Sequence, residues 1–355
     1  MYYWIEKIKL ILKMNKKFRI KTSDQAYIIA EISGNHNGNI LNAIKLIDEC
    51  KRIGANAVKI QTYEPIDITL NSLKKDFLIN KSSPWRKFKN LWNLYSKAQT
   101  PFKWQEILFN HASKINIDIF SSPFSERAVD ILEKLNCKLY KLASPEINHI
   151  PLIEKIAKTN KPLIISTGMA NEKSIDYAIK VFRKFSKQQI ILLKCNSSYP
   201  SPLNQVNLNA IPYMQKKYKT IIGLSDHTNG YEVPLASIPL GAKVIEKHIC
   251  LSKKNKIDGF FSLNVIEFQE MIKKIRNIEI ALGKKLISNT KKNNMGGRSI
   301  YFSKNIKKGE KITDHNIKVV RPSNGLHPKF YNNILGKKVT KNFFKGDRVL
   351  IKFVI

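Results

Sequence analysis

Two histidines lie at the ends of two successive apolar runs, where together they could bind a metal ion. The run "TIIGLSDH" ends at His227, and the run "KVIEKHI" carries His248 near its end. On neighbouring parallel strands, the two imidazoles would meet at one edge of the sheet and could share a divalent cation. A lone histidine more often bonds a loop carbonyl, but two at equivalent positions favour a metal. Nitrogen ligands with carboxylate or water partners leave manganese, iron, cobalt and zinc open.

Two lysines inside apolar runs indicate a site for an anion. Lys59 lies in "AVKIQ" and Lys141 in "LYKLAS". A buried ammonium group is costly unless an anion pairs with it, although in a lysine-rich chain each could also be a surface residue. Hydroxyls near the ends of other runs could orient a phosphate or a carboxylate beside these lysines. These hydroxyls belong to Ser144, Ser166, Ser197 and Ser225.

A turn rich in glycine and asparagine follows the first apolar run. In "EISGNHNGN", Glu31 is a candidate base or partner of a metal-bound water, whereas Asn35 and His36 could equally be turn formers. Residues two apart on a strand share a face, so Glu246 and His248 would point toward the same mouth. The chain carries no Ser-His-Asp ordering, P-loop or GxGxxG fingerprint.

The elements that must position these residues repeat from Tyr27 onward. Eight apolar runs alternate with amphipathic segments, and the runs span 27–33, 56–63, 117–124, 138–145, 162–168, 190–197, 220–227 and 243–249. Near-continuous apolar runs separated by helices are typical of a parallel sheet covered by helices. Eight such units in roughly 260 residues favour an α/β fold of the (β/α)₈ TIM-barrel type, with an open doubly wound sheet as the alternative. Active sites of such barrels lie at the C-terminal ends of the strands, where these polar residues fall.

We predict four segments along the chain: an N-terminal extension (1–20), the barrel (21–285), a polar linker (286–297) and a small all-β module (298–355). The module repeats itself, since "NIKKGEKI" (305–312) echoes "NFFKGDRV" (342–349). So short a module has a marginal core and is expected to dock on another surface. The aromatic-rich stretch between Thr69 and Thr100 is expected to add a helix and a loop over the barrel mouth.

Composition argues against several classes of protein. The 62 basic and 27 acidic residues give a net charge of +35, but the lysines are spread along the chain with no aromatic-interleaved basic module. This pattern indicates a compositionally biased genome rather than a nucleic-acid partner. Four cysteines without CxxC spacing are typical of buried thiols in a reducing cytoplasm. We expect no membrane span, because no apolar run is long enough, and no signal peptide, because lysines interrupt the first segment.

Several motifs in this order resemble the sialic acid synthase family, the phosphoenolpyruvate-dependent nonulosonate synthases. The motifs are "AEISGNHNG", "AVKIQTY", "YKLAS", "STGMA", "LLKCNSSYPSP", "GLSDHT", "EKHI" and "RPSNGLHP". The resemblance runs from about residue 27 to the end of the chain. It implies a TIM barrel followed by a SAF (antifreeze-like) domain. "LYSKAQTPFKW" and "RPSNGLHPKFYNNILGKK" are closer to the pseudaminic acid synthase branch than to the other branches.

The resemblance implies a transferase reaction. Phosphoenolpyruvate would condense with 2,4-diacetamido-2,4,6-trideoxy-β-L-altropyranose and water to give pseudaminic acid and phosphate. One alternative is an N-acetylneuraminic or legionaminic acid synthase, which uses a manno-configured sugar. An alternative of another class is a basic carbohydrate-binding protein without catalysis.

The resemblance also implies a role for each matching residue. His227 and His248 match ligands of a divalent metal, usually Mn²⁺, and together with Glu31 they are the catalytic set. The residues that match the phosphoenolpyruvate site are Lys59, Lys141, Ser144, Ser166, Ser197 and Ser225. The residues that match the sugar side are Gln61, Ser122, Phe124, Glu146, Tyr199, Asp258 and Arg321.

Two positions depart from the family's usual sequence, and a third position, Arg321, implies an assembly. Ser197 stands where the neuraminate enzymes have asparagine, and "KNKIDGFFSL" around Asp258 replaces the more usual Gly-Pro-Asp wording. Arg321 matches the arginine that the SAF domain of one subunit inserts into its partner's barrel. The resemblance therefore implies a domain-swapped homodimer.

Overall fold

Two units make up the chain, Met1–Gly283 and Lys284–Ile355, and each is described by itself. The structure is a computed structural model that describes residues 18–20, 25–254, 257–283 and 296–355. Most of the predicted extension (1–20) and of the predicted linker (286–297) lies outside the described residues. Of the extension, Ile20 is buried, and its N–H donates to Gln189 Oε1 at 3.1 Å.

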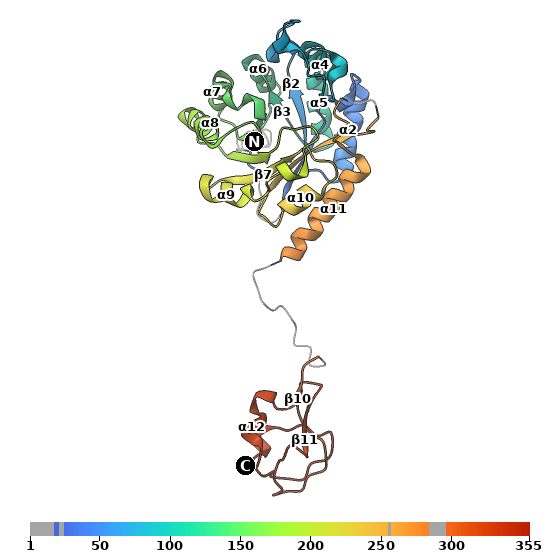
Figure 1. The fold of residues 1–355 in the computed structure, drawn as a ribbon, viewed down its shortest axis with the longest axis vertical. Coiled ribbons are helices and arrows are strands. Elements are labelled where there is room, and N and C mark those ends of the chain that lie inside the picture. The colour runs from blue at the N-terminus through green and yellow to red at the C-terminus, as the bar shows by residue number, and fades with distance from the viewer. Residues whose placement is uncertain (1–17, 21–24, 255–256, 284–295) are drawn as a thin grey trace, which may run out of the picture. The chain divides into compact units, whose positions relative to one another are not determined.

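A closed parallel barrel forms the first unit (Figure 1). Within the described residues its strands are β1 (Tyr27–Glu31), β2 (Ala57–Thr62), β3 (Asp118–Pro123), β4 (Tyr140–Leu142), β5 (Leu163–Ser166), β6 (Ile190–Cys195), β7 (Ile221–Asp226) and β8 (Val244–Cys250). Closure is direct, because β1 pairs in parallel with both β2 and β8. The predicted TIM barrel is confirmed, and the open-sheet alternative is wrong.

The predicted apolar runs contain these strands almost entirely. Each strand lies inside its run except β8, which continues one residue further to Cys250. The reason is that a strand of a helix-covered barrel is buried on both faces, which demands a near-continuous apolar run. The sequence missed only the short β9 (Leu263–Asn264), which pairs with β8 and is too short to show a period.

Helices follow the strands and surround the barrel, as Figure 1 shows. In the described part of the unit they are α2 (Ile40–Arg52), α5 (Phe102–Lys114), α6 (Glu126–Lys134), α7 (Ile150–Lys158), α8 (Glu172–Phe185), α9 (Ala210–Tyr218), α10 (Glu232–Ser237) and α11 (Val265–Leu282). Their apolar faces pack on the sheet, as in α2, where Ala43, Ile47 and Cys50 are buried. Side-chain caps start several of them: Asn39 accepts from Leu41 N–H at 2.8 Å, which satisfies one of the first helical donors.

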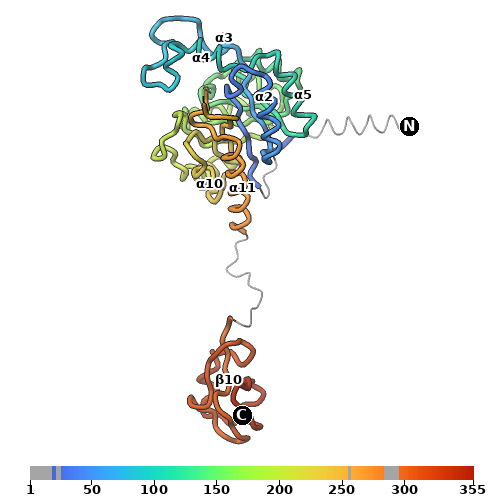
Figure 2. Tube along the Cα trace, turned by 90° about the vertical axis from the view of Figure 1, so that its right-hand side faces the viewer, coloured from blue at the N-terminus to red at the C-terminus, as the bar shows by residue number. Residues whose placement is uncertain are grey.

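The insertion between β2 and α5 forms a separate piece beside the barrel (Figure 2). It contains α3 (Pro65–Ile68), the 3₁₀ turns η2 (Lys75–Phe77) and η3 (Arg86–Phe88), and α4 (Leu91–Ala98). Leu94 and Ala98 of α4 pack with Ile257 in a small buried cluster. Trp85 fastens the insertion by donating from Nε1 to the Ile257 carbonyl at 3.0 Å. The expected helix is therefore present.

The second unit is a small module built on short antiparallel pairs. Its strands β10 (Ser299–Phe302) and β11 (Ile317–Val320) pair antiparallel, and short turns η6 (Pro328–Phe330), α12 (Tyr331–Ile334) and η7 (Ile351–Phe353) follow. The predicted internal repeat is real. Ile306 and Phe343 exchange both backbone hydrogen bonds at 2.9 Å. The repeats also cap each other, since Lys308 N–H donates to Asn342 and Lys345 N–H donates to Asn305.

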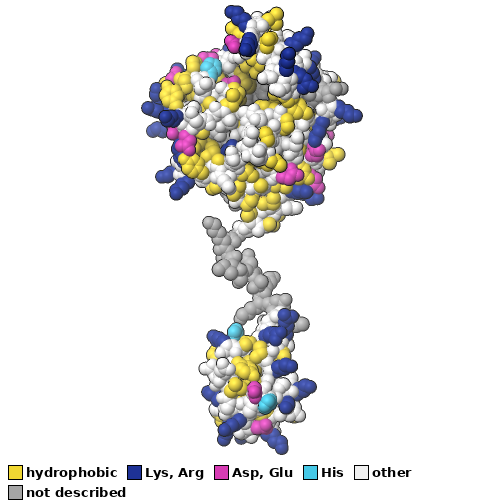
Figure 3. Space-filling model, in the orientation of Figure 1, with side chains coloured by type: hydrophobic (Ala, Val, Ile, Leu, Met, Phe, Trp, Pro, Cys, Tyr) yellow, Lys and Arg dark blue, Asp and Glu magenta, His cyan; other side chains and the backbone are white. Residues whose placement is uncertain are grey.

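Three further expectations concern the distribution of basic side chains on the surface, the state of the cysteines and the absence of a membrane-spanning helix. Lys and Arg side chains are scattered over the visible face of each unit in Figure 3, without one dominant patch. All four cysteines are buried thiols, as predicted. In the part of the chain that the structure describes, no helix combines the length and the apolar character needed to cross a bilayer.

Candidate active site

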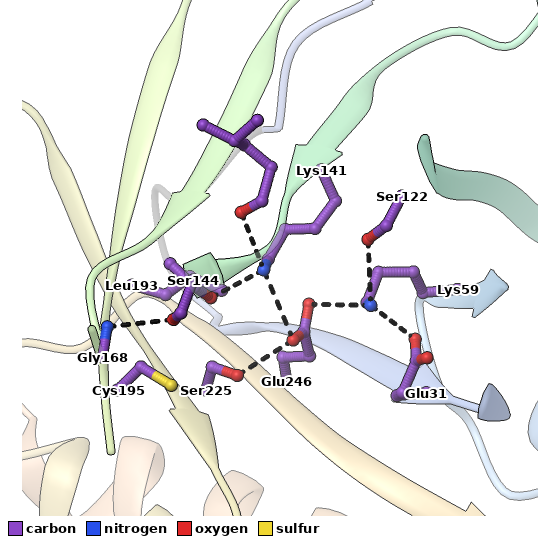
Figure 4. Close-up of polar contacts among 12 residues, drawn as sticks. Glu31, Lys59, Ser122, Lys141, Ser144, Gly168, Leu193, Cys195, Ser225 and Glu246 are labelled. Atoms are coloured by element: carbon purple, nitrogen blue, oxygen red, sulfur yellow. Dashed lines mark hydrogen bonds and ion pairs between the residues drawn. The ribbon is translucent and has the colours of Figure 1, made fainter. Parts of the chain in front are cut away.

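Two lysines and two glutamates form a buried charge cluster inside the barrel (Figure 4). Lys59 Nζ lies 2.7 Å from Glu31 Oε2 and 3.9 Å from Glu246 Oε2. Lys141 Nζ lies 3.7 Å from Glu246 Oε1. All four side chains are almost completely buried. Both lysines are buried, as their place in apolar runs indicated, and carboxylates of the chain itself neutralise them.

Serine hydroxyls surround the cluster. Lys141 Nζ donates to Ser166 Oγ at 2.6 Å, and Ser225 Oγ donates to Glu246 Oε1 at 2.9 Å. Ser122, which the resemblance places on the sugar side, accepts from Lys59 Nζ at 3.3 Å. The hydroxyls can therefore orient whatever anion binds the lysines.

Three of the surrounding polar groups come close together at the backbone of Gly168. Its N–H donates to Ser144 Oγ at 2.9 Å. A Cβ added at this position would lie 2.4 Å from Ser197 Oγ and 2.9 Å from Cys195 Sγ. A side chain at this position would force these groups to move, so glycine allows Ser144, Cys195 and Ser197 to lie close to one another.

The pKa values of the two glutamates are shifted in opposite directions. Burial raises the pKa of Glu31 to about 6, even though Lys59 opposes this effect. Burial acts on Glu246 too, but the ammonium groups of Lys141 and Lys59 outweigh it and lower the pKa of Glu246 below its ordinary value. Glu246 is therefore a permanent counter-charge, whereas Glu31 is poised to exchange a proton.

The two predicted metal ligands lie side by side. The ring centroids of His227 and His248 are 5.3 Å apart. His227 Nδ1 lies 2.8 Å from the Asn196 carbonyl, which can only accept, so Nδ1 carries the proton and Nε2 keeps its lone pair. His248 Nδ1 is buried and has no hydrogen-bond partner within the described ranges. Burial, together with the ammonium groups of Lys59, Lys247 and Lys141, holds the pKa of His248 well below its ordinary value, so this imidazole is neutral.

This arrangement fits a divalent cation held by two nitrogen ligands. Neutral imidazole is a common ligand for such ions, and an orphaned buried nitrogen has no other partner that would explain it. Across the described residues, no group of three or more His, Cys, Asp and Glu side chains comes together to enclose an ion. The remaining coordination positions would thus be open to substrate or water, as in catalytic metal sites.

A pocket of about 270 Å³ opens next to the charge cluster and His248. Its polar lining consists of Ser33, Gln61, Glu146, Asp258 and His248. Its wall is apolar and aromatic, with Tyr63, Ile68, Trp85, Leu94, Tyr95, Ala98, Phe124, Tyr199, Ile257 and Phe261. The structure thus brings five predicted sugar-side residues together, namely Gln61, Phe124, Glu146, Tyr199 and Asp258.

Hydrogen bonds join the floor of this pocket to the charge cluster. Gln61 Nε2 donates to Glu31 Oε1 at 3.1 Å and to Ser33 Oγ at 3.2 Å. Ser33 Oγ donates to Asp258 Oδ2 at 2.5 Å. Asp258 therefore lies in the pocket despite its unusual sequence context. Glu146 Oε2 is buried without a partner among the described residues, and burial raises the pKa of Glu146 to about 7.

Other candidates have structural roles or lie elsewhere. Asn35 Nδ2 donates to the Ile249 carbonyl and to Ser262 Oγ, both at 2.9 Å, so it ties the turn after β1 to the end of β8. His36 Nδ1 accepts from Gly38 N–H within that turn. Arg321 follows β11 in the second unit, where it is exposed.

Sequence reasoning placed Glu246 at the mouth, two residues before His248 on the same strand face, but gave it no role in the site. The apolar wall contributed by α4 and Ile257 was also missed, because no periodic pattern links those segments.

The chain matches known proteins along most of its length. Residues 46–286 match the NeuB family, and residues 297–352 match the SAF domain. A pseudaminic acid synthase from Campylobacter jejuni is 43% identical over 92% of this chain and 96% of the relative. An N,N'-diacetyllegionaminic acid synthase from the same species is 38% identical over 91% of this chain and 98% of the relative.

Solved structures show the same fold. The crystal structure of an N-acetylneuraminic acid synthetase from Leptospira borgpetersenii, in complex with citrate, has 31% identity and a TM-score of 0.67. The match covers 75% of this chain and 88% of that one.

Proposed function

The chain belongs to the NeuB family and carries a SAF domain, and from this we propose that it synthesises pseudaminic acid. The enzyme condenses phosphoenolpyruvate with 2,4-diacetamido-2,4,6-trideoxy-β-L-altropyranose and water, and it releases phosphate. One observation carries the proposal: the buried lysine pair and the histidine pair adjoin one pocket whose outer wall is apolar. The identity with pseudaminic acid synthases, higher than with the legionaminic relative, supports this choice of sugar.

Lys59 and Lys141 bind the phosphate and carboxylate groups of phosphoenolpyruvate. Their ammonium groups are buried, so an anion that reaches them is held in a medium where charge pairing is strong. Ser166 and Ser225 add directed hydrogen bonds. Both lysines already contact glutamates, so phosphoenolpyruvate competes with Glu246 and Glu31 for them.

The sugar occupies the adjoining pocket with its reactive C1 toward His248. A divalent cation held by His227 and His248, Mn²⁺ in our proposal, would polarise the aldehyde carbonyl as a Lewis acid. The pyranose first opens to its aldehyde form. C3 of phosphoenolpyruvate then forms the new bond to C1 as the π bond of the C1 carbonyl breaks and its oxygen takes a proton from solvent, which leaves positive character at C2. Water adds to C2, and Glu31 takes its proton, a role that suits a carboxylate with a pKa of about 6. The C2–O bond to phosphate then breaks, and the C2 ketone forms.

We further propose that the enzyme works in the cytoplasm as a homodimer, in which the SAF domain of one subunit supplies Arg321 to its partner's barrel. Two observations support this assembly. Arg321 is exposed. Ile66, Leu70 and Phe260, which neighbour pocket residues in the sequence, expose large parts of their apolar surface and would gain from being covered.

A substrate panel tests the proposed activity. Purified protein with Mn²⁺ and phosphoenolpyruvate is offered the altro-configured sugar, its manno-configured 2,4-diacetamido epimer or N-acetylmannosamine. We expect phosphate release and a nonulosonate of the pseudaminic acid mass mainly with the first sugar. Preferential turnover of either of the other two sugars would assign the chain to another branch of the family. Failure to consume phosphoenolpyruvate with any of them would favour a carbohydrate-binding protein without catalysis.

The apolar wall makes a separate prediction about the sugar. A 6-deoxy sugar with acetamido groups carries methyl groups that an apolar wall binds well, whereas a polar wall would solvate that region. Leu94→Asn is therefore expected to raise the KM for the 6-deoxy sugar about tenfold and to leave the KM for phosphoenolpyruvate unchanged. Initial rates at varied concentrations of each substrate measure both constants.

Leu73→Asn is the matched control for this variant. Leu73 belongs to the same insertion, but its side chain is 78% exposed and does not line the pocket. It should leave both KM values unchanged. Equal effects of the two substitutions would show that the wall does not contact the sugar.

A further inference from the structure

A buried ion pair lies behind the two metal-binding histidines, on the opposite face of their strands. Asp226 and Lys247 are register partners at the paired ends of β7 and β8. Each directly neighbours one histidine in the sequence, and successive residues of a strand point to opposite faces. The pair therefore points away from the site, toward the layer where α10 packs on β7. Neither residue lines the sugar pocket.

The pair holds the chain on both sides of His227. Lys247 Nζ donates to Asp226 Oδ2 and, at 2.5 Å, to the Thr228 carbonyl. Thr228 in turn donates to Asp226 from its hydroxyl at 3.0 Å and from its N–H at 3.2 Å. Since Asp226 and Thr228 flank His227, all of these bonds fix the backbone that carries the His227 ring. Lys247 anchors the same network to β8, next to His248.

All three residues of this network are almost completely buried. Lys247 is 0% exposed, Asp226 3% and Thr228 1%. Replacing a buried ion pair with apolar residues of similar volume is often neutral for stability, so stability alone does not account for such a pair. The best-attested use of such pairs is to fix one geometry among several.

We propose that Asp226 and Lys247 are positioning residues that set the spacing of His227 and His248, and thereby the affinity of that pair for a divalent cation. This inference rests on the metal role given to the two histidines in the proposed function. It adds that the site depends on a network that touches neither the cation nor the substrates. Partners that orient metal ligands from behind typically contribute 10- to 100-fold in metal affinity.

The test is Mn²⁺ binding without substrates. The purified full-length chain is stripped with a chelator, and Mn²⁺ is titrated while free Mn²⁺ is followed by electron paramagnetic resonance. The double variant Asp226→Leu/Lys247→Met removes both charges together, so that neither is left alone in the interior. We expect its Kd for Mn²⁺ to rise about 10- to 100-fold, with the KM for phosphoenolpyruvate at saturating Mn²⁺ within about twofold of the wild type. Excess Mn²⁺ should restore much of the lost kcat.

Lys161→Met is the control for stability. Lys161 pairs with Glu133 at 2.5 Å, remote from the histidines in sequence, and its loss should lower the melting temperature without changing the Kd for Mn²⁺. A folded double variant that binds Mn²⁺ as tightly as the wild type would overturn the proposal. If the double variant does not fold, Asp226→Asn/Lys247→Gln, which removes both charges but keeps groups that can hydrogen-bond, decides in the same way. A wild-type chain that binds no Mn²⁺ would instead contradict the metal role of the histidines, and the inference with it.

Discussion

Replacing His227 with alanine is expected to abolish condensation and metal retention while the barrel stays folded. The variant would remove one of the two nitrogen ligands that we propose, and polarisation of the aldehyde by a bound cation contributes several kcal/mol to such a reaction. Because each 1.4 kcal/mol is a factor of about ten in rate, kcat should fall at least about 1,000-fold. Phosphate release measures the rate, and elemental analysis of the desalted protein measures the metal.

The fold should survive because, within the described residues, the His227 ring makes one short hydrogen bond, to the Asn196 carbonyl, and one long polar contact, to Cys195 Sγ at 3.9 Å. His227 donates to the Asn196 carbonyl, and leaving that acceptor unpaired costs about 1–3 kcal/mol. His111→Ala is a suitable control, since His111 lies on α5 and pairs with Asp48 at 2.6 Å on the surface. The control should keep full activity. If the His227→Ala variant kept wild-type activity and metal content, His227 would not be a metal ligand.

Lys59→Met is expected to lower kcat/KM for phosphoenolpyruvate about 100-fold. Lys59 is the buried cation between Glu31 and Glu246, so its loss would remove the charged partner that we propose for the substrate. Each hydrogen bond to a charged group is worth about 1.5–3 kcal/mol. The two carboxylates would then repel each other as well as the incoming anion. Initial rates of phosphate release against phosphoenolpyruvate concentration, at saturating sugar, measure the effect.

Lys194→Met is the control that separates the effect of losing Lys59 from the effect of losing any lysine on a strand. Lys194 is half-buried on β6, and its Nζ donates to the Cys195 carbonyl at 2.9 Å. Its replacement should change kcat/KM by less than about threefold, as expected for a residue outside the site. If the two variants behave alike, Lys59 does not bind phosphoenolpyruvate.

The order of the strands was readable from the sequence because burial on both faces leaves a continuous apolar signature. The lengths of the strands were harder to predict from the sequence. The run predicted at 138–145 contains only the three-residue β4, and the rest of it forms a different local structure. Where a strand ends depends on hydrogen bonds to its neighbours, which are distant in the sequence and leave no local pattern.

Lys59 and Lys141 could be assigned to a buried anion site because an ammonium group inside an apolar run requires a negative partner. The identity of that partner could not be predicted. Glu246 reaches both lysines across the barrel, from a strand that is far from either along the chain. The same holds for Ile257, which meets α4 of the insertion only after both have folded onto the mouth.

The sequence by itself determined the alternation of strands and helices and the polar residue types at the strand ends, because these follow from burial and from the two-residue period of a strand. Only the tertiary structure decided which of those residues meet. Closure of β1 against β8 puts Glu31 in register with His248, and it does so through backbone hydrogen bonds that every residue can make. Backbone hydrogen bonds do not depend on side-chain identity and therefore leave no pattern in the sequence. The contacts that they create become visible only in the folded chain.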